Sequence, residues 1–151
     1  MEDILEAAIR VLRKGGARGF TTVRVAEEAG VSVGSLYQYF PNKEALLFRL
    51  QADEWQDTGD LLASILDDSQ RTLLDRLRHA VLVFFRSELE EAELRSALDD
   101  AGALFRAAPE ARAQQALAAQ RLRRFMRELL PLVSAKRRLF AADFIGTSMG
   151  A

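Results

Sequence analysis

Residues 33–39 include two tyrosines, one glycine and no acidic side chain. If this segment is helical, Leu36 and Phe40 share one face at i, i+4 spacing and leave the opposite face to small, polar and aromatic residues. Hydroxyl and amide side chains can hydrogen-bond to base edges, an apolar side chain can touch a thymine methyl group, and a glycine lets backbone come close. These residue types therefore favour a face that contacts DNA over one that is exposed only to solvent. Its candidate base-contacting residues are Val33, Gly34, Ser35 and Gln38.

Hydroxyl and ammonium groups beside this face could hold DNA phosphates and set the register of the protein on the duplex. They belong to Thr22, Tyr37, Tyr39 and Lys43. The alternatives that need no DNA are that the tyrosines are half-buried surface aromatics and that Lys43 merely begins a helix, where a cation is mildly unfavourable. Under every alternative we expect Thr22 to cap a helix.

Two short helices and a tight turn are predicted to position these residues. The first helix covers about 23–29, and either Thr21 or Thr22 can cap it. The second helix covers about 33–40. Gly30 permits the turn between them, Ser32 caps the second helix, and Pro41 ends it. This layout is that of a helix-turn-helix, which places its second helix in the DNA major groove.

The remaining elements are also predicted to be helices, because apolar residues recur at three- and four-residue steps and no strand-like alternation is convincing. A helix over 3–14 ends at Gly15 and Gly16. A long helix begins near Lys43 and links two domains, with Gly59 as a possible hinge or break. Further helices are predicted at about 71–90, 92–107, 109–130 and 135–150.

These elements predict an all-α protein with a DNA-binding domain over 1–48 and a second helical domain over 49–151. The formal net charge of the chain is −1. The first fifty residues hold seven Lys/Arg and six Asp/Glu, a net of +1, which leaves −2 for the rest. A DNA site on this chain must therefore depend on where charges are placed rather than on bulk charge.

The composition gives little support for catalytic or metal chemistry. The chain has no cysteine, a single histidine (His79) and no glycine-rich phosphate loop, so we expect neither an enzyme nor a metal or cofactor site. The N-terminal segment lacks the apolar core of a signal peptide, and no run of about 18 apolar residues occurs. We therefore expect a cytoplasmic protein without membrane contact.

Residues 4–50 resemble the N-terminal DNA-binding domain of the TetR family of transcriptional regulators. The resemblance rests on the threonine pair before the first short helix, AGVS at the turn, LYQYF in the second helix and PNKEALL at the start of the long helix. Many family members carry a basic or polar residue where this chain has Val33. By this resemblance, the positions aligned with DNA contacts are Thr22, Ser32, Val33, Ser35, Tyr37, Tyr39 and Lys43.

The resemblance also implies a homodimer that represses transcription from a near-palindromic double-stranded operator, with half-sites about 34 Å apart. A small, often lipophilic effector in the C-terminal domain would change the spacing of the two DNA-reading helices. Ordinary core packing is the simpler account of the aromatic residues that could line its pocket. These candidates are Trp55, Phe84, Phe85, Phe105 and Phe125.

By the resemblance, family dimers pair through their last two long helices. This chain is expected to end after the first of them or inside it, with the final helix missing by truncation or by disorder. The arginine cluster over 121–127 is expected to be a solvated face, or otherwise to meet an acidic ligand or partner. The main alternative function is a helical protein-interaction module that keeps the helix-turn-helix scaffold without ligand-regulated DNA binding.

Overall fold

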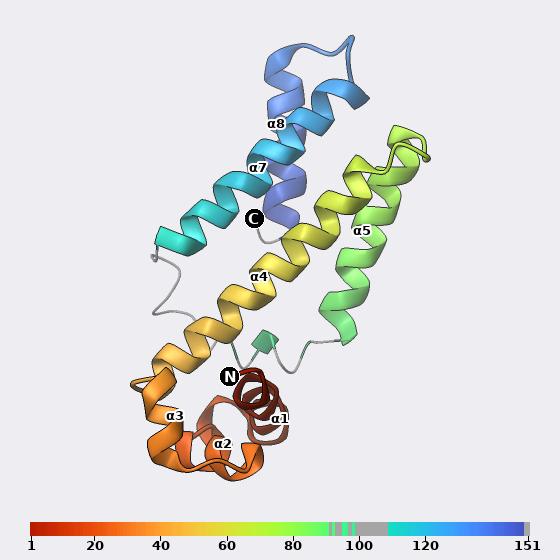
Figure 1. Cartoon of the computed structure of the whole chain (residues 1–151). Helices are drawn as coiled ribbons and strands as arrows, with labels where there is room; N and C mark the ends of the chain where they lie inside the picture. Colours follow the sequence, from red (N-terminus) through yellow and green to blue (C-terminus); the bar gives the residue numbers. More distant parts are fainter. Residues whose placement is uncertain (91, 93–94, 97, 99–108, 150–151) are drawn as a thin grey trace. The chain divides into compact units, whose positions relative to one another are not determined.

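The computed structural model describes residues 1–90, 92, 95–96, 98 and 109–149 (Figure 1). Within these residues every regular element is a helix, which confirms the predicted all-α class. The chain forms two compact units, each made of two separate stretches. The first comprises Met1–Glu54 and Glu88–Ala107, and the second Trp55–Ser87 and Ala108–Ala151. The boundary predicted after residue 48 stays a prediction.

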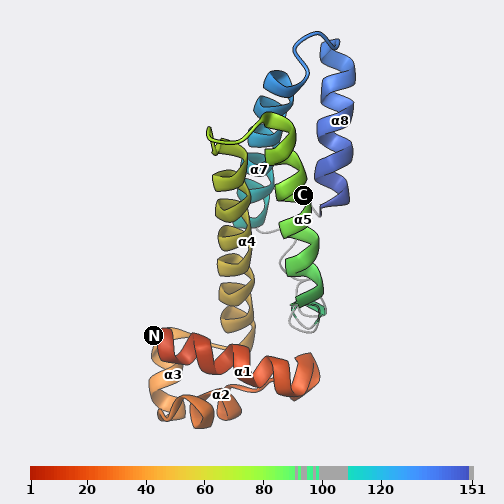
Figure 2. The ribbon, with the colours of Figure 1, turned by 90° about the vertical axis from the view of Figure 1, so that its right-hand side faces the viewer.

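The first unit contains α1, α2, α3 and the beginning of the long helix α4, which Figure 2 labels. α1 is kinked at Gly16, where φ is 58° and ψ is −173°, a conformation that glycine adopts far more readily than other residues. The glycine pair predicted to end the first helix therefore marks a kink, beyond which helical structure resumes. The helices are α1 (Glu2–Gly19), α2 (Thr22–Ala29), α3 (Val33–Tyr39) and the start of α4 (Lys43–Asp67).

One apolar core joins these helices. Phe20, the apolar residue between α1 and α2, is 1% exposed. Leu36 and Phe40 pack into the same core as Val25 and Ala26, as their spacing predicted. Each fully buried Leu or Phe contributes about 1.5–3 kcal/mol, so this core fixes α3 against its neighbours. The largest fully buried side chains are Leu12, Phe20, Val25, Leu36, Leu46 and Leu98.

The second unit contains the rest of α4 and three further helices. α4 is a single helix through Gly59, so that residue marks no break. α7 packs against α8, burying Phe125, Met126 and Ala142. The helix predicted over 92–107 falls mostly outside the described residues. The further helices are α5 (Leu73–Glu90), α7 (Pro109–Leu129) and α8 (Ala135–Ser148). None of the helices described here is both long and apolar enough to span a bilayer.

Candidate nucleic-acid interface

The turn between α2 and α3 is fixed by local hydrogen bonds. Gly30 ends α2 in the left-handed conformation, with φ 67° and ψ 28°. The amide of Val31 donates to the carbonyl of Ala26 over 3.0 Å, which closes the helix end. Ser32 then caps α3, because its Oγ accepts a hydrogen bond from the Ser35 amide at 3.0 Å. The predicted roles of Gly30 and Ser32 are therefore confirmed.

Thr22 is not the cap of α2, contrary to the sequence-based prediction. The capping oxygen is Thr21 Oγ1, which accepts from the Arg24 amide at 3.3 Å. Thr21 has the extended backbone of a capping residue, whereas Thr22 is the first helical residue. Thr22 is only 9% exposed, and its Oγ1 lies 3.1 Å from Tyr37 Oη. Either Thr21 or Thr22 could have capped α2 by residue type. Thr21 is the cap because its backbone is extended, whereas Thr22 is already helical.

The outer side of α3 carries the predicted DNA-contacting residues. Leu36 is fully buried beneath it, while Tyr37 is 48% and Tyr39 55% exposed. Lys43 is exposed in the first turn of α4, close to where Asn42 Oδ1 accepts from the Ala45 amide at 2.7 Å. The structure thus leaves all the predicted contact residues except Thr22 at least partly accessible. The others on or beside α3 are Ser32, Val33, Gly34, Ser35 and Gln38. Their contacts with DNA remain predictions.

Two details refine the roles expected within this face. The hydroxyl oxygens of Ser32 and Ser35 lie 2.8 Å apart, so a base contact by Ser35 would share or replace that hydrogen bond. A Cβ atom added at Gly34 would come 3.7 Å from Ser32 Oγ, an ordinary contact. The fold itself therefore does not require glycine at position 34.

Two ion pairs join α2 to α1. Glu28 accepts from Arg10 Nε at 2.9 Å and from Lys14 Nζ at 3.3 Å. The hydrogen bond from Arg10, followed by that from Lys14, lowers the pKa of the Glu28 carboxyl below its ordinary value of 4.5. Both basic side chains remain largely exposed, at 46% for Arg10 and 70% for Lys14, while they pair with Glu28.

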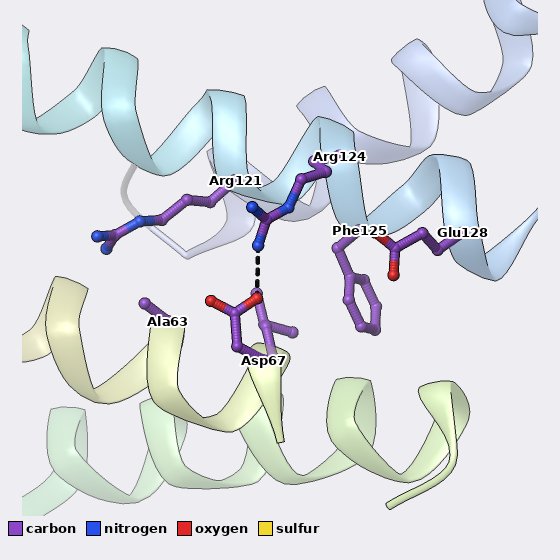
Figure 3. Close-up of a pocket in the computed structure, with 7 residues that line it drawn as sticks. Ala63, Asp67, Arg121, Arg124, Phe125 and Glu128 are labelled. Carbon is purple, nitrogen blue, oxygen red and sulfur yellow. Dashed lines mark hydrogen bonds and ion pairs between the residues drawn. The ribbon is translucent and has the colours of Figure 1, made fainter. Parts of the chain in front are cut away.

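The arginine cluster of α7 is largely engaged with carboxylates of the second unit. Arg124 pairs with Asp67 of α4, as Figure 3 shows. Arg121 donates to the Gly59 carbonyl at 3.3 Å, and Arg123 lies 3.0 Å from Asp143 of α8. Arg123 and Arg124 are more than half exposed, so this face is solvated, as predicted, while its arginines pair with groups on α4 and α8.

Among the described candidates for the effector pocket, Phe125 alone lines the cavity drawn in Figure 3. That cavity between α4 and α7 measures about 10 Å³, close to the room that one water needs. Phe84 is 8% exposed and meets the half-exposed ring of Phe85 edge-on, with centroids 5.5 Å apart. Trp55 is partly buried, and Phe105 lies outside the described residues. The effector-pocket assignment stays a prediction.

His79 is partly buried on α5. Among the residues that the structure describes, no three histidine or acidic side chains are grouped so that they could hold a metal ion. The interface on the first unit is therefore the most developed candidate site in the described structure.

Two family models match the chain. Residues 4–50 match the family described as "Bacterial regulatory proteins, tetR family". Residues 72–151, more than half of the chain, match "Tetracyclin repressor-like, C-terminal domain". The chain belongs to the TetR family. The resemblance predicted from residues 4–50 is thereby confirmed, and the second match extends it through the C-terminal half of this TetR protein.

Curated relatives and solved structures agree with this assignment. The chain is 35% identical over 71 residues to "Uncharacterized HTH-type transcriptional regulator YvkB" of Bacillus subtilis, a match covering 47% of this chain and 38% of that protein. It is 31% identical over 86 residues to "HTH-type transcriptional repressor DrrR1" of Streptomyces coeruleorubidus, covering 57% and 32%. The chain thus spans about a third of the length of these curated relatives.

The fold of this TetR chain is also that of a solved regulator. The structure of the fatty acid degradation regulator FadR from Bacillus halodurans matches with a TM-score of 0.66 at 17% identity. The match covers 98% of this chain and 82% of FadR. At this level of identity the likeness shows the shared fold.

Proposed function

We propose that this chain is a transcriptional repressor that binds a near-palindromic DNA operator as a homodimer and responds to a small effector. The main observation that supports this proposal is the accessible face of α3. Tyr37 and Tyr39 are about half exposed on a helix whose opposite side is buried, and no acidic residue lies within that helix. Such a face can hydrogen-bond to base edges and phosphates without electrostatic repulsion from carboxylates.

An exposed aromatic pair on α8 supports the homodimer. Phe140 is 72% and Phe144 65% exposed, and their rings are stacked with centroids 6.4 Å apart. Leu139 beside them is 46% exposed. Clustered large apolar side chains on a surface mark an association site. A second copy would cover them and supply a second DNA-reading helix for the other half-site.

The effector is proposed to be small and lipophilic, because the described part of the second unit offers apolar and aromatic side chains. Phe84 and Phe85 on α5 are the described aromatic residues that support this class of ligand. Thermal-shift measurements with lipophilic compounds test it, since a ligand bound only by the native state raises the unfolding temperature.

DNA binding is tested by selecting a duplex from a random-sequence pool and measuring its affinity by fluorescence anisotropy. We expect a dissociation constant of about 10⁻⁸ M or lower at physiological salt, weakening steeply as salt rises. Tyr39→Ala and Gln38→Ala should each weaken binding without changing the unfolding temperature. Leu82→Ala, which removes a 69% exposed side chain from α5, serves as the control.

The alternative interaction module makes the opposite prediction. A cooperatively folded protein that retains no duplex even at low salt would overturn the repressor assignment and favour the module. Unchanged affinity of the Tyr39→Ala and Gln38→Ala proteins would instead overturn only the assignment of the DNA-reading face.

A further inference from the structure

A hydrogen bond joins the two helices of the helix-turn-helix at the edge of the proposed DNA face. Thr22 Oγ1, in the first turn of α2, lies 3.1 Å from Tyr37 Oη on α3. Thr22 is 9% exposed, whereas Tyr37 is 48% exposed. The threonine of this pair is therefore buried within the first unit, whereas the tyrosine is exposed at its surface. Either hydroxyl can be the donor in the free protein.

The Thr22 hydroxyl is available for this bond because another residue caps the helix. Thr21 Oγ1 accepts from the Arg24 amide, which satisfies one of the unpaired amides at the start of α2. With the cap supplied by Thr21, the hydroxyl of Thr22 is left to orient Tyr37. Its burial also makes it a poor group for reaching a phosphate directly.

Contact with a phosphate would fix the direction of the bond. A phosphate diester oxygen carries no proton, so Tyr37 can hydrogen-bond to it only by donating its single phenolic proton. Tyr37 Oη must then act as the acceptor toward Thr22, and Thr22 must donate. The opposite arrangement, in which Tyr37 donates to Thr22, would leave no phenolic proton for DNA.

We infer that Thr22 is a positioning residue, which donates its proton to Tyr37 Oη and so keeps the phenolic O–H directed at a DNA phosphate. The inference rests on the proposed function and replaces the direct phosphate contact predicted for Thr22. The hydrogen bond from Thr22 holds the Tyr37 ring in place before DNA binds. Less conformational freedom is then lost on binding, and the affinity is higher.

Three variants and one double variant test this inference on the selected duplex. Thr22→Val keeps the shape but removes the hydroxyl, Thr22→Ser keeps the hydroxyl, and Tyr37→Phe removes the phosphate donor. We expect the dissociation constant to rise about tenfold for Tyr37→Phe and about three- to tenfold for Thr22→Val, with Thr22→Ser close to the unsubstituted protein. The double variant Thr22→Val/Tyr37→Phe should bind no more weakly than Tyr37→Phe alone.

A purely structural role for Thr22 would give a different pattern. Its effect on DNA affinity would be independent of the Tyr37 hydroxyl and would therefore add to that of Tyr37→Phe. All these variants should also keep the salt dependence of binding, because none removes a cation. If Thr22→Val does not fold, Thr22→Ala is compared with Thr22→Ser under the same expectations.

The inference is overturned if the hydroxyl-free Thr22 variant binds as tightly as the unsubstituted protein, or if its loss is additive with Tyr37→Phe. An unsubstituted protein that binds no selected duplex overturns the proposed function itself. The two failures are therefore distinguished by whether the unsubstituted protein binds.

Discussion

Arg95 Nη2 lies 2.7 Å from Glu54 Oε1, and the two side chains are only 18% and 12% exposed. The other terminal nitrogen, Nη1, pairs with Glu88 at the end of α5. One guanidinium thus joins two carboxylates within the first unit, far from the helix-turn-helix in sequence. Removing the guanidinium would break this ion pair to a largely buried carboxylate.

We therefore predict that Arg95→Ala lowers the free energy of unfolding by about 3 kcal/mol, the scale for breaking a buried ion pair from one side. Arg49→Ala is the matched control, because Arg49 pairs with Asp53 on the same helix as Glu54, but with both side chains more than a third exposed. That pair should contribute less than about 1 kcal/mol. Urea unfolding measures both, and equal losses would contradict the prediction.

The pH dependence of Glu28 provides a second test. The pKa of this carboxyl is lowered by its hydrogen bonds to Arg10 and Lys14, so its ionised form stabilises the native state. The stabilisation is present above the ordinary value of 4.5 and is lost as the pH falls through the lowered value. Glu28→Gln should therefore be less stable than the parent at neutral pH, and the difference should shrink below pH 4.5. Unfolding curves across this range check it; a difference independent of pH would contradict it.

Lys43 offers a test of phosphate contact that is independent of the tyrosines. If its exposed ammonium neutralises one phosphate, Lys43→Gln should weaken binding to all duplexes alike and reduce the slope of log affinity against log salt by about 1 for each protomer. Lys136→Gln, which removes an exposed lysine from α8, is the control. An unchanged slope for the Lys43 variant would remove this residue from the interface.

Substitution of Gly34 tests whether glycine is required at this position for DNA binding rather than for folding. An added Cβ makes only an ordinary contact in the free protein, so Gly34→Ala should fold and gain at most about 1 kcal/mol from better helix propensity. If backbone here approaches DNA, the same variant should lose about tenfold in affinity. Thermal unfolding and anisotropy are compared on one sample. Unchanged affinity would show that DNA does not approach this backbone closely.

The exposed rings of α8 predict the effect of substitution on self-association. Phe140→Ser combined with Phe144→Ser should raise the dimer dissociation constant at least about tenfold, because an apolar contact that excludes water is lost. Sedimentation velocity over a range of concentrations measures this. Leu82→Ser, which alters another exposed apolar residue on a different helix, should leave association unchanged. Similar behaviour of both proteins would place the dimer interface elsewhere.

Much of the candidate interface could be predicted because its signals act over three or four residues. Ser32 and Asn42 cap the helices that follow them, and Gly30 supplies the left-handed turn, each through a bond to a neighbour in the chain. The i, i+4 spacing of Leu36 and Phe40 correctly predicted the buried side of α3 and hence its exposed side.

The sequence by itself determined the all-α class, the caps at Ser32 and Asn42, the family and the exposed face of α3, because these follow from local hydrogen bonding, periodicity and motif. Tertiary structure decided which residues of distant segments meet. Thr22 pairs with Tyr37 fifteen positions away, and Leu98 joins a core made mainly by α1–α4. It also decided that Arg95 meets Glu54. Periodicity shows which side of a helix is buried, but not what covers it, because packing depends on the path of the whole chain.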